Sequence, residues 1–102
     1  MQEILSWIQD WYASQCNGDW EHSYGIEITT IDNPGWFITI DLEDTNLELI
    51  DSDSEVFERS ETDWYFYKFK NKKFEASGDP EKLEFLLMKF KEVAESESGS
   101  KT

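Results

Sequence analysis

The sequence contains few of the residues from which disulfides, metal sites and redox sites are built. Its 102 residues include one cysteine, Cys16, and one histidine, His22. A single cysteine excludes an intramolecular disulfide and is typical of a reducing compartment. The first residues, Met1-Gln2-Glu3, lack the basic and apolar regions of a signal peptide, and no apolar run approaches the ~20 residues of a membrane span. We therefore expect a cytoplasmic protein without a membrane segment.

Basic residues are absent from the first 58 positions. Residues 1–58 contain no Lys or Arg and 14 Asp or Glu, whereas residues 59–102 contain nine of each kind, so the net charge of −14 resides in the first part. Direct nucleic-acid binding requires a basic face that displaces counterions from phosphates. The chain offers one small basic cluster, which consists of Lys68, Lys70, Lys72 and Lys73. We therefore expect no direct contact with nucleic acid.

Aromatic residues, in contrast, make up 16% of the chain, which is typical of a globular domain and not of a disordered acidic chain. Apolar residues with helical spacing predict an amphipathic helix over Gln2–Gln15, ended by Asn17-Gly18. A second helix is expected to open at Asp79 as N-cap and Pro80 as its first residue. Its apolar stripe consists of Leu83, Leu86, Leu87, Phe90, Val93 and Ala94.

Alternating apolar and polar residues predict two hairpins. In the turn Asp32–Gly35 of the first hairpin, Pro34 is expected at the first central position and Gly35 at positive φ. The acidic stretch 41–63 is expected to be partly strand and partly loop. The predicted strands are residues 24–29, 36–42, 64–69 and 74–77.

These elements predict an α+β fold in which an N-terminal helix precedes an antiparallel sheet of four or five strands and a C-terminal helix follows it. Both helices are expected on one sheet face, because two helices can cover one face of such a sheet. The other face then meets solvent or a partner. We expect a single domain over residues 1–95 and a disordered tail over residues 96–102, which has no apolar residue.

Catalytic and metal-binding chemistry have little support in the sequence. Cys16 and His22 could form a nucleophile and its base, but no orienting group or oxyanion pocket is indicated, and we expect Cys16 to be a small buried residue. Asp19 and Glu21 are possible metal ligands beside His22, but zinc sites usually use several Cys or His. The stretch 51–55 resembles part of a calcium loop without its glycine and final glutamate. We expect no catalytic residue, no metal and no cofactor.

The acidic stretch is the strongest indication of function. A charge run is usually a solvated surface, but so large a net charge destabilises the compact state by self-repulsion. This destabilisation is explained if the electrostatic field of the acidic residues steers a basic protein partner toward the chain. We predict that the partner binds at Asp41, Glu43, Asp44, Glu48, Asp51, Asp53 and Glu55.

Two segments resemble a known family. The first runs from Trp11 to Ile26 and contains Gly18-Asp19-Trp20-Glu21-His22, and the second runs from Thr30 to Leu42 and contains Asp32-Asn33-Pro34-Gly35-Trp36. Together they resemble the immunity protein 53 family of bacterial polymorphic toxin systems. The family motif residues are Asp19, Trp20, Glu21, His22, Pro34, Gly35 and Trp36.

The resemblance implies a cytosolic antidote that binds and blocks a cognate toxin domain without chemistry of its own. The toxin would have a basic surface, as a nuclease does, and could belong to a contact-dependent inhibition system. We expect a monomer or a one-to-one complex with the toxin. Two alternatives remain open: an acidic regulatory or nucleic-acid-mimicking module, and a small hydrolase that uses Cys16 and His22.

Overall fold

The computed structural model describes residues 3–99, apart from the side chains of Asp53 and of residues 97–99. It confirms the predicted α+β fold, with an N-terminal helix, a five-stranded antiparallel sheet and a C-terminal helix. A one-turn helix, α2, precedes the sheet. The elements are α1 (Ile4–Gln15), α2 (Trp20–Ser23), β1 (Ile26–Ile31), β2 (Gly35–Asp41), β3 (Ser52–Ser60), β4 (Asp63–Lys70), β5 (Lys73–Gly78) and α3 (Leu83–Gly99).

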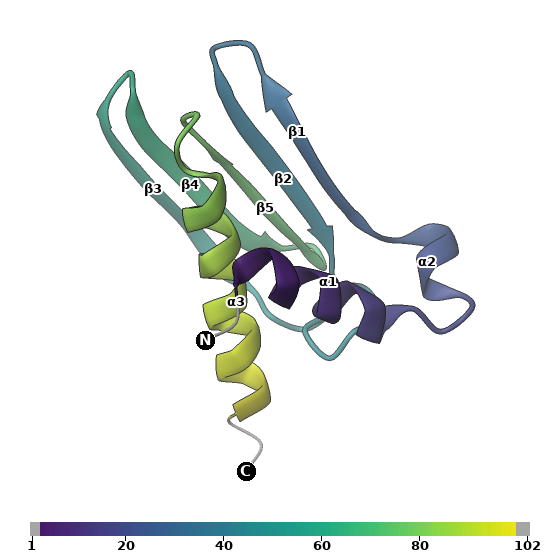
Figure 1. The fold of residues 1–102 in the computed structure, drawn as a ribbon. Coiled ribbons are helices and arrows are strands. Elements are labelled where there is room, and N and C mark those ends of the chain that lie inside the picture. The colour runs from purple at the N-terminus through teal and green to yellow at the C-terminus, as the bar shows by residue number, and fades with distance from the viewer. Residues whose placement is uncertain (1–2, 100–102) are drawn as a thin grey trace.

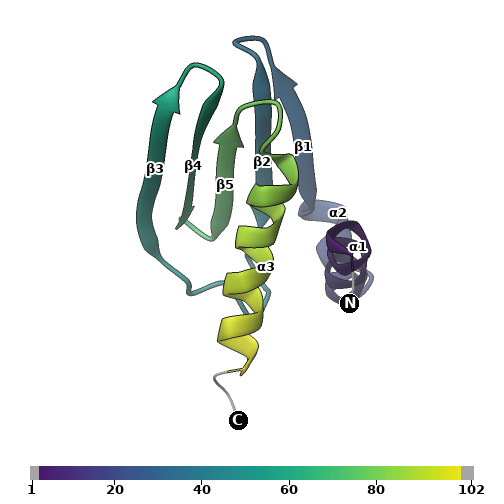
Figure 2. The same ribbon diagram turned by 60° about the vertical axis from the view of Figure 1, so that its left-hand side comes forward.

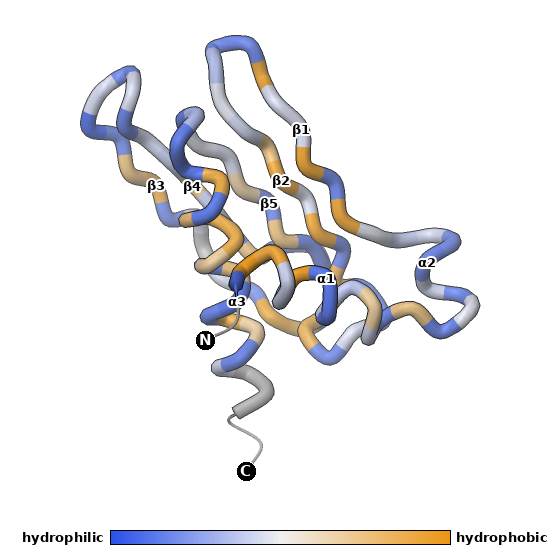
Figure 3. Tube along the Cα trace, in the orientation of Figure 1, coloured by the Kyte–Doolittle hydropathy of each residue, from blue (hydrophilic) through white to orange (hydrophobic). Residues whose placement is uncertain are grey.

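The strand order in the sheet is β1-β2-β5-β4-β3, and all neighbouring strands are antiparallel (Figure 1). The last strand in sequence, β5, is inserted between the two hairpins β1–β2 and β3–β4. This order leaves β1 and β3 as the two edges. Hydrophobic residues alternate along β1 and β2 (Figure 3), as expected for strands with one apolar face.

Helix α3 crosses one face of the sheet, and α1 packs against α3 near one end of the strands (Figure 2). The spacing of apolar residues along α3 directs Leu86, Leu87 and Phe90 into the core, where they are at most 1% exposed. Ile38 and Ile40 of β2 face them from the sheet and are fully buried. Other buried core residues are Phe69, Phe74, Ala76, Trp11 and Trp20.

The expected start of the second helix is wrong. The N–H of Asp79 donates to the carbonyl of Trp64 at 3.1 Å, so Asp79 continues the pairing between β5 and β4. Its carboxylate accepts the N–H of Glu81 at 2.9 Å and holds a turn. Helix α3 begins only at Leu83, because the backbone of Asp79 is still hydrogen-bonded to the neighbouring strand.

The glycine of the first hairpin has a different role from the predicted one. Gly18 is the glycine with positive φ among the described residues, and Gly35 is the first residue of β2. A Cβ at Gly35 would meet the carbonyl oxygen of Gly78 and would lie 3.2 Å from the Trp64 ring. Gly35 is therefore needed for close approach between strands, whereas the turn itself contains Pro34 after a cis peptide bond.

The C-terminal boundary also differs from the expectation of a disordered tail from Ser96. Helix α3 continues through Ser96 to Gly99. Glu and Ser can extend an existing helix even where no apolar residue anchors it, because propagation requires no new nucleus. Residues 100–102 of the predicted tail lie outside the described residues.

Candidate partner-binding surface

The acidic residues between β2 and β3 gather around the turn that joins β4 to β5. After Asp41, the N–H of Leu42 donates to the carbonyl of Lys72 in this turn at 2.9 Å. The buried side chains of Leu42 and Leu47 anchor the loop to the core. The loop passes β5 and β4 to reach β3, a crossing of three strand spacings or about 14 Å. We call the carboxylates along this crossing the acidic arc: Asp41, Glu43, Asp44, Glu48, Asp51, Asp53 and Glu55.

Three lysines beside the β4–β5 turn form ion pairs with the acidic arc. The lysine side chains are 46–49% exposed, so solvent screens each pair and its contribution to stability is small. The fourth member of the basic cluster, Lys68, lies 3.5 Å from Glu75. The basic cluster is thus paired within the molecule. The pairs with the arc are Lys70–Asp51 at 3.4 Å, Lys72–Glu48 at 3.3 Å and Lys73–Asp41 at 3.4 Å.

Glu48 also fixes the shape of the loop. Its carboxylate accepts the backbone N–H of Asp44 at 2.9 Å. This hydrogen bond, followed by that from Lys72, lowers the pKa of Glu48, and Glu48 in turn raises the pKa of Lys72. Glu48 therefore acts within the loop as well as on its surface.

Three described acids of the arc form no ion pair with a lysine. Burial first, and then the negative charge of Glu43 and a hydrogen bond to it, raise the pKa of Tyr24. Burial and a hydrogen bond to Glu55 likewise raise the pKa of Tyr67 to about 12. The side chain of Asp44 is exposed. The negative charges of these three acids, Glu43, Asp44 and Glu55, are therefore not offset by a lysine partner.

The first motif segment supports the arc from beneath. Trp20 is 3% exposed, and its indole Nε1 donates to the carbonyl oxygen of Glu43 at 2.9 Å. The ring lies edge-on to Trp11 with centroids 6.1 Å apart and is also close to Tyr12 and Tyr24. The motif tryptophan thus joins the aromatic core to the acidic loop.

The neighbouring motif residues hold the connection between α1 and α2. The carboxylate of Glu21 accepts the N–H groups of Asn17 at 3.0 Å and Gly18 at 2.9 Å. The pKa of Glu21 is lowered chiefly by its own backbone amide, burial opposes this as the second-largest effect, and the amides of Asn17 and Gly18 lower the pKa further. Asp19 and His22 are exposed. Glu21 therefore holds the connection between α1 and α2.

Asn17 has a role that was not expected from the sequence, since its side chain holds the turn that leads into α2. Its Oδ1 accepts the N–H groups of Asp19 and Trp20, both at 2.9 Å. Asn17 had been assigned only to the end of α1. The signal was present, since Asn favours helix N-caps and local side-chain turns.

The second motif segment lies at the other end of β2 from the arc. The indole Nε1 of Trp36 donates to the carbonyl oxygen of Pro80 at 2.9 Å, which fixes the turn before α3. Gly35 contacts Gly78, as described above, and Pro34 is exposed in the hairpin turn. The structure therefore does not bring the two motif segments together, and each holds a different loop.

Comparison with protein families identifies the chain. A model of the family described as Immunity protein 53 matches residues 5–95. The chain belongs to the immunity protein 53 family. Searches of curated proteins and of solved structures found no match. Because immunity proteins generally bind cognate toxins, the surface of interest is one that binds a protein.

The only cysteine and histidine of this immunity protein are both exposed, so the expectation of a buried Cys16 is wrong. Cys16 follows the last residue of α1, and its thiol donates to the carbonyl of Tyr12 at 3.4 Å. None of the described contacts joins Cys16 to His22. Across residues 3–99, no three described His, Cys, Asp or Glu side chains come together as metal ligands, and no described helix is long and apolar enough to cross a membrane.

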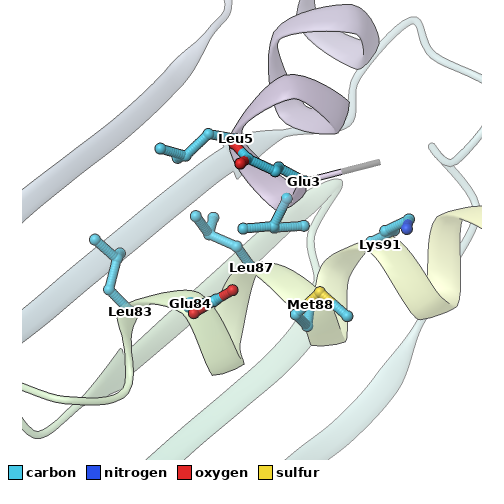
Figure 4. A pocket seen from close by; sticks show the side chains of 8 residues that line it. Glu3, Leu5, Leu83, Glu84, Leu87, Met88 and Lys91 are labelled. Atoms are coloured by element: carbon cyan, nitrogen blue, oxygen red, sulfur yellow. The ribbon is translucent and has the colours of Figure 1, made fainter. Parts of the chain in front are cut away.

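An apolar groove of about 530 Å³ lies between the start of α1 and α3. Leu83, Leu87 and Met88 come from α3 and lie opposite Leu5 of α1, with Lys91 farther along α3 (Figure 4). Leu5 is 61% exposed. The charged residues Glu3, Glu84 and Lys91 also line the groove.

Proposed function

We propose that this immunity protein binds and neutralises its cognate toxin through the acidic arc, without catalysis of its own. The observation that carries the proposal is the imbalance at the arc, where three of the six carboxylates whose side chains are described, those of Glu43, Asp44 and Glu55, form no ion pair with a lysine. Exposed carboxylates without cations create a negative potential that steers a basic partner. We further propose a cytoplasmic monomer that forms a one-to-one complex.

The toxin is expected to present a basic surface. Toxins that attack nucleic acid carry such a surface in the active-site cleft, since they bind phosphates. The acidic arc would occupy this cleft in place of the phosphates. A stable interface of ordinary size buries about 1,600 Å² in total, so residues beyond the arc must also take part.

The test is a triple variant that removes only charge, Glu43→Gln, Asp44→Asn and Glu55→Gln. Gln retains an acceptor for the Tyr24 and Tyr67 hydroxyls, and Asn tolerates the φ of 63° at Asp44. Binding is measured against a catalytically inactive form of the toxin domain encoded by the neighbouring gene. We expect association about tenfold slower at low salt, with little change in dissociation. At 1 M salt, where the Debye length is about 3 Å, the difference should vanish.

The matched control removes three charges elsewhere, by Glu61→Gln, Glu84→Gln and Glu95→Gln. These side chains are exposed and lie outside the arc. The control should associate at close to the rate of the unmodified protein. Equal slowing in both variants would show an effect of net charge alone and would remove the arc as the binding site.

A further inference from the structure

Strand β1 has a regular, uncovered outer edge. All six of its residues pair with β2 without a bulge, from Ile26 opposite Ile40 to Ile31 opposite Gly35. Among the described residues, the other side of β1 has no neighbouring strand, and Figures 1 and 2 show no helix alongside it. Backbone groups along this side are therefore available to another chain.

The register identifies which backbone groups these are. The N–H of Asp41 donates to the carbonyl of Gly25 at 3.0 Å, so this is a hydrogen-bonded pair. Such pairs alternate along an antiparallel ladder. Ile26, Ile28 and Thr30 therefore direct their N–H and C=O groups away from β2, with the spacing that a further strand requires.

The opposite edge is protected in ways that β1 is not. The pairing of β3 with β4 is interrupted between Ser52 and Glu55 and again between Glu58 and Ser60. Strand β3 also contains the charged residues Asp53, Glu55, Glu58 and Arg59. Bulges and charges are common protections against edge-to-edge pairing. Strand β1 has one charged residue, Glu27, among β-favouring Ile and Thr.

We propose that the edge of β1 accepts an extended strand of the toxin, which adds a sixth strand to the sheet. The added strand should carry a basic residue opposite Glu27 and apolar residues beside Ile26 and Ile28, because cross-strand pairs stabilise a sheet. Ile28 is 39% exposed and would be covered. This inference rests on the proposed function and specifies how the toxin is bound next to the acidic arc.

Charge and position support a toxin strand over a second copy of this chain. Each copy carries a net charge of −14, and residues 1–58 have no Lys or Arg to offset it. Two copies joined at β1 would therefore repel each other. The N-terminal end of β1 also lies next to the acidic arc, since the Asp41 carboxylate accepts the N–H of Gly25 at 3.0 Å. One basic partner could therefore reach both surfaces.

The first experiment is hydrogen exchange on the free protein and on its complex with the inactive toxin domain. The amides of Ile26, Ile28 and Thr30 should exchange rapidly in the free protein and at least about tenfold more slowly in the complex. The outward amides of the other edge, Val56 and Glu58, serve as the internal control and should not change.

The second experiment places proline on each edge in turn. Ile28→Pro removes an outward N–H without breaking the ladder to β2, a position that edge strands tolerate. It should weaken toxin binding about tenfold, the factor expected for one backbone hydrogen bond. Val56→Pro is the matched control on β3 and should bind within about twofold of the unmodified protein.

The outcomes separate the two proposals. If the complex forms and the β1 amides remain unprotected, the strand-addition inference is wrong while toxin binding stands. If no complex forms, both fail. If the free protein dimerises and the β1 amides are protected in that dimer, the occupant is a second copy and the inference is overturned. The hydrogen-exchange experiment tests the strand-addition inference even if the Ile28→Pro variant does not fold.

Discussion

The indole Nε1 of Trp20 donates a 2.9 Å hydrogen bond to the carbonyl oxygen of Glu43, which lies 23 residues further along the chain. The bond connects the first motif segment with the acidic arc. The Trp20 side chain is buried, whereas the side chains of Asp44, Asp51 and Glu55 in the arc are exposed. Trp20 therefore supports the acidic loop from the core without being part of its surface.

Trp20→Phe should destabilise the protein and loosen the acidic loop. The variant retains an aromatic ring but loses the hydrogen bond and part of the buried surface, at a cost of about 1–3 kcal/mol in the free energy of unfolding. Urea unfolding measures the stability, and hydrogen exchange over residues 42–50 reports the loop. Trp36→Phe is the control, since it loses a comparable indole hydrogen bond, to the carbonyl oxygen of Pro80 at the other end of β2 from the loop. Equal loop exchange in both variants would contradict the prediction.

Gly35→Ala should be much more damaging than Gly25→Ala. A Cβ at Gly35 meets the Gly78 carbonyl and the Trp64 ring, whereas a Cβ at Gly25 meets no atom within 4 Å. Because the obstacle is backbone, we expect a loss of about 1–3 kcal/mol at Gly35 and less than about 0.5 kcal/mol at Gly25. Chemical denaturation of the two variants compares them directly. Similar stabilities would show that β2 and β5 can move apart without cost.

The sequence predicted the elements of this fold better than their connections. Helical and strand periodicity located both long helices and the hairpins, because burial of one face determines that pattern. It misplaced Asp79, whose backbone pairs with Trp64, and it assigned Gly35 to a positive φ. Both roles depend on strands that are distant in sequence, which local turn rules do not include.

The acidic stretch was visible in the sequence, but its ion pairs were not. Residues 70–73 and residues 41–51 meet only because β5 inserts between β2 and β4. A count of charges along the chain cannot predict this strand order. The structure thus reduces the seven predicted carboxylates to a smaller set without lysine partners, of which Glu43, Asp44 and Glu55 are described.

Asp79→Asn should destabilise the protein at neutral pH. The Asp79 carboxylate is 1% exposed and accepts the N–H of Trp64 at 2.9 Å and Nζ of Lys82 at 2.6 Å. Loss of a charge from a buried ion pair lowers the free energy of unfolding by about 3 kcal/mol. This value is at the low end of the usual range, because Lys82 keeps its ion pair with Asp63. Urea unfolding at pH 7 provides the measurement.

The same variant should have a distinctive pH dependence. Burial alone would raise the pKa of Asp79, but Lys82 and the amides of Trp64 and Glu81 lower it below its ordinary value. Its stabilising effect is therefore present above about pH 4, the ordinary pKa of Asp, and is lost as the pH falls through the folded-state pKa. The stability gap between the unmodified protein and Asp79→Asn should narrow below pH 4. A constant gap between the unmodified protein and Asp79→Asn across this pH range would refute the assignment.

Lys72→Gln should increase the rate of toxin association. Lys72 lies 3.3 Å from Glu48 in a solvent-screened ion pair, so its loss should change stability little. It also removes the cation nearest to the centre of the acidic arc. One unit charge at about 10 Å in water is worth about 0.4 kcal/mol, which corresponds to about a twofold faster association at low salt. Lys89→Gln, which breaks the pair with Glu92 on α3, is the control. Stopped-flow binding at two ionic strengths distinguishes them: if Lys72→Gln associates no faster than Lys89→Gln, the toxin does not approach through the arc.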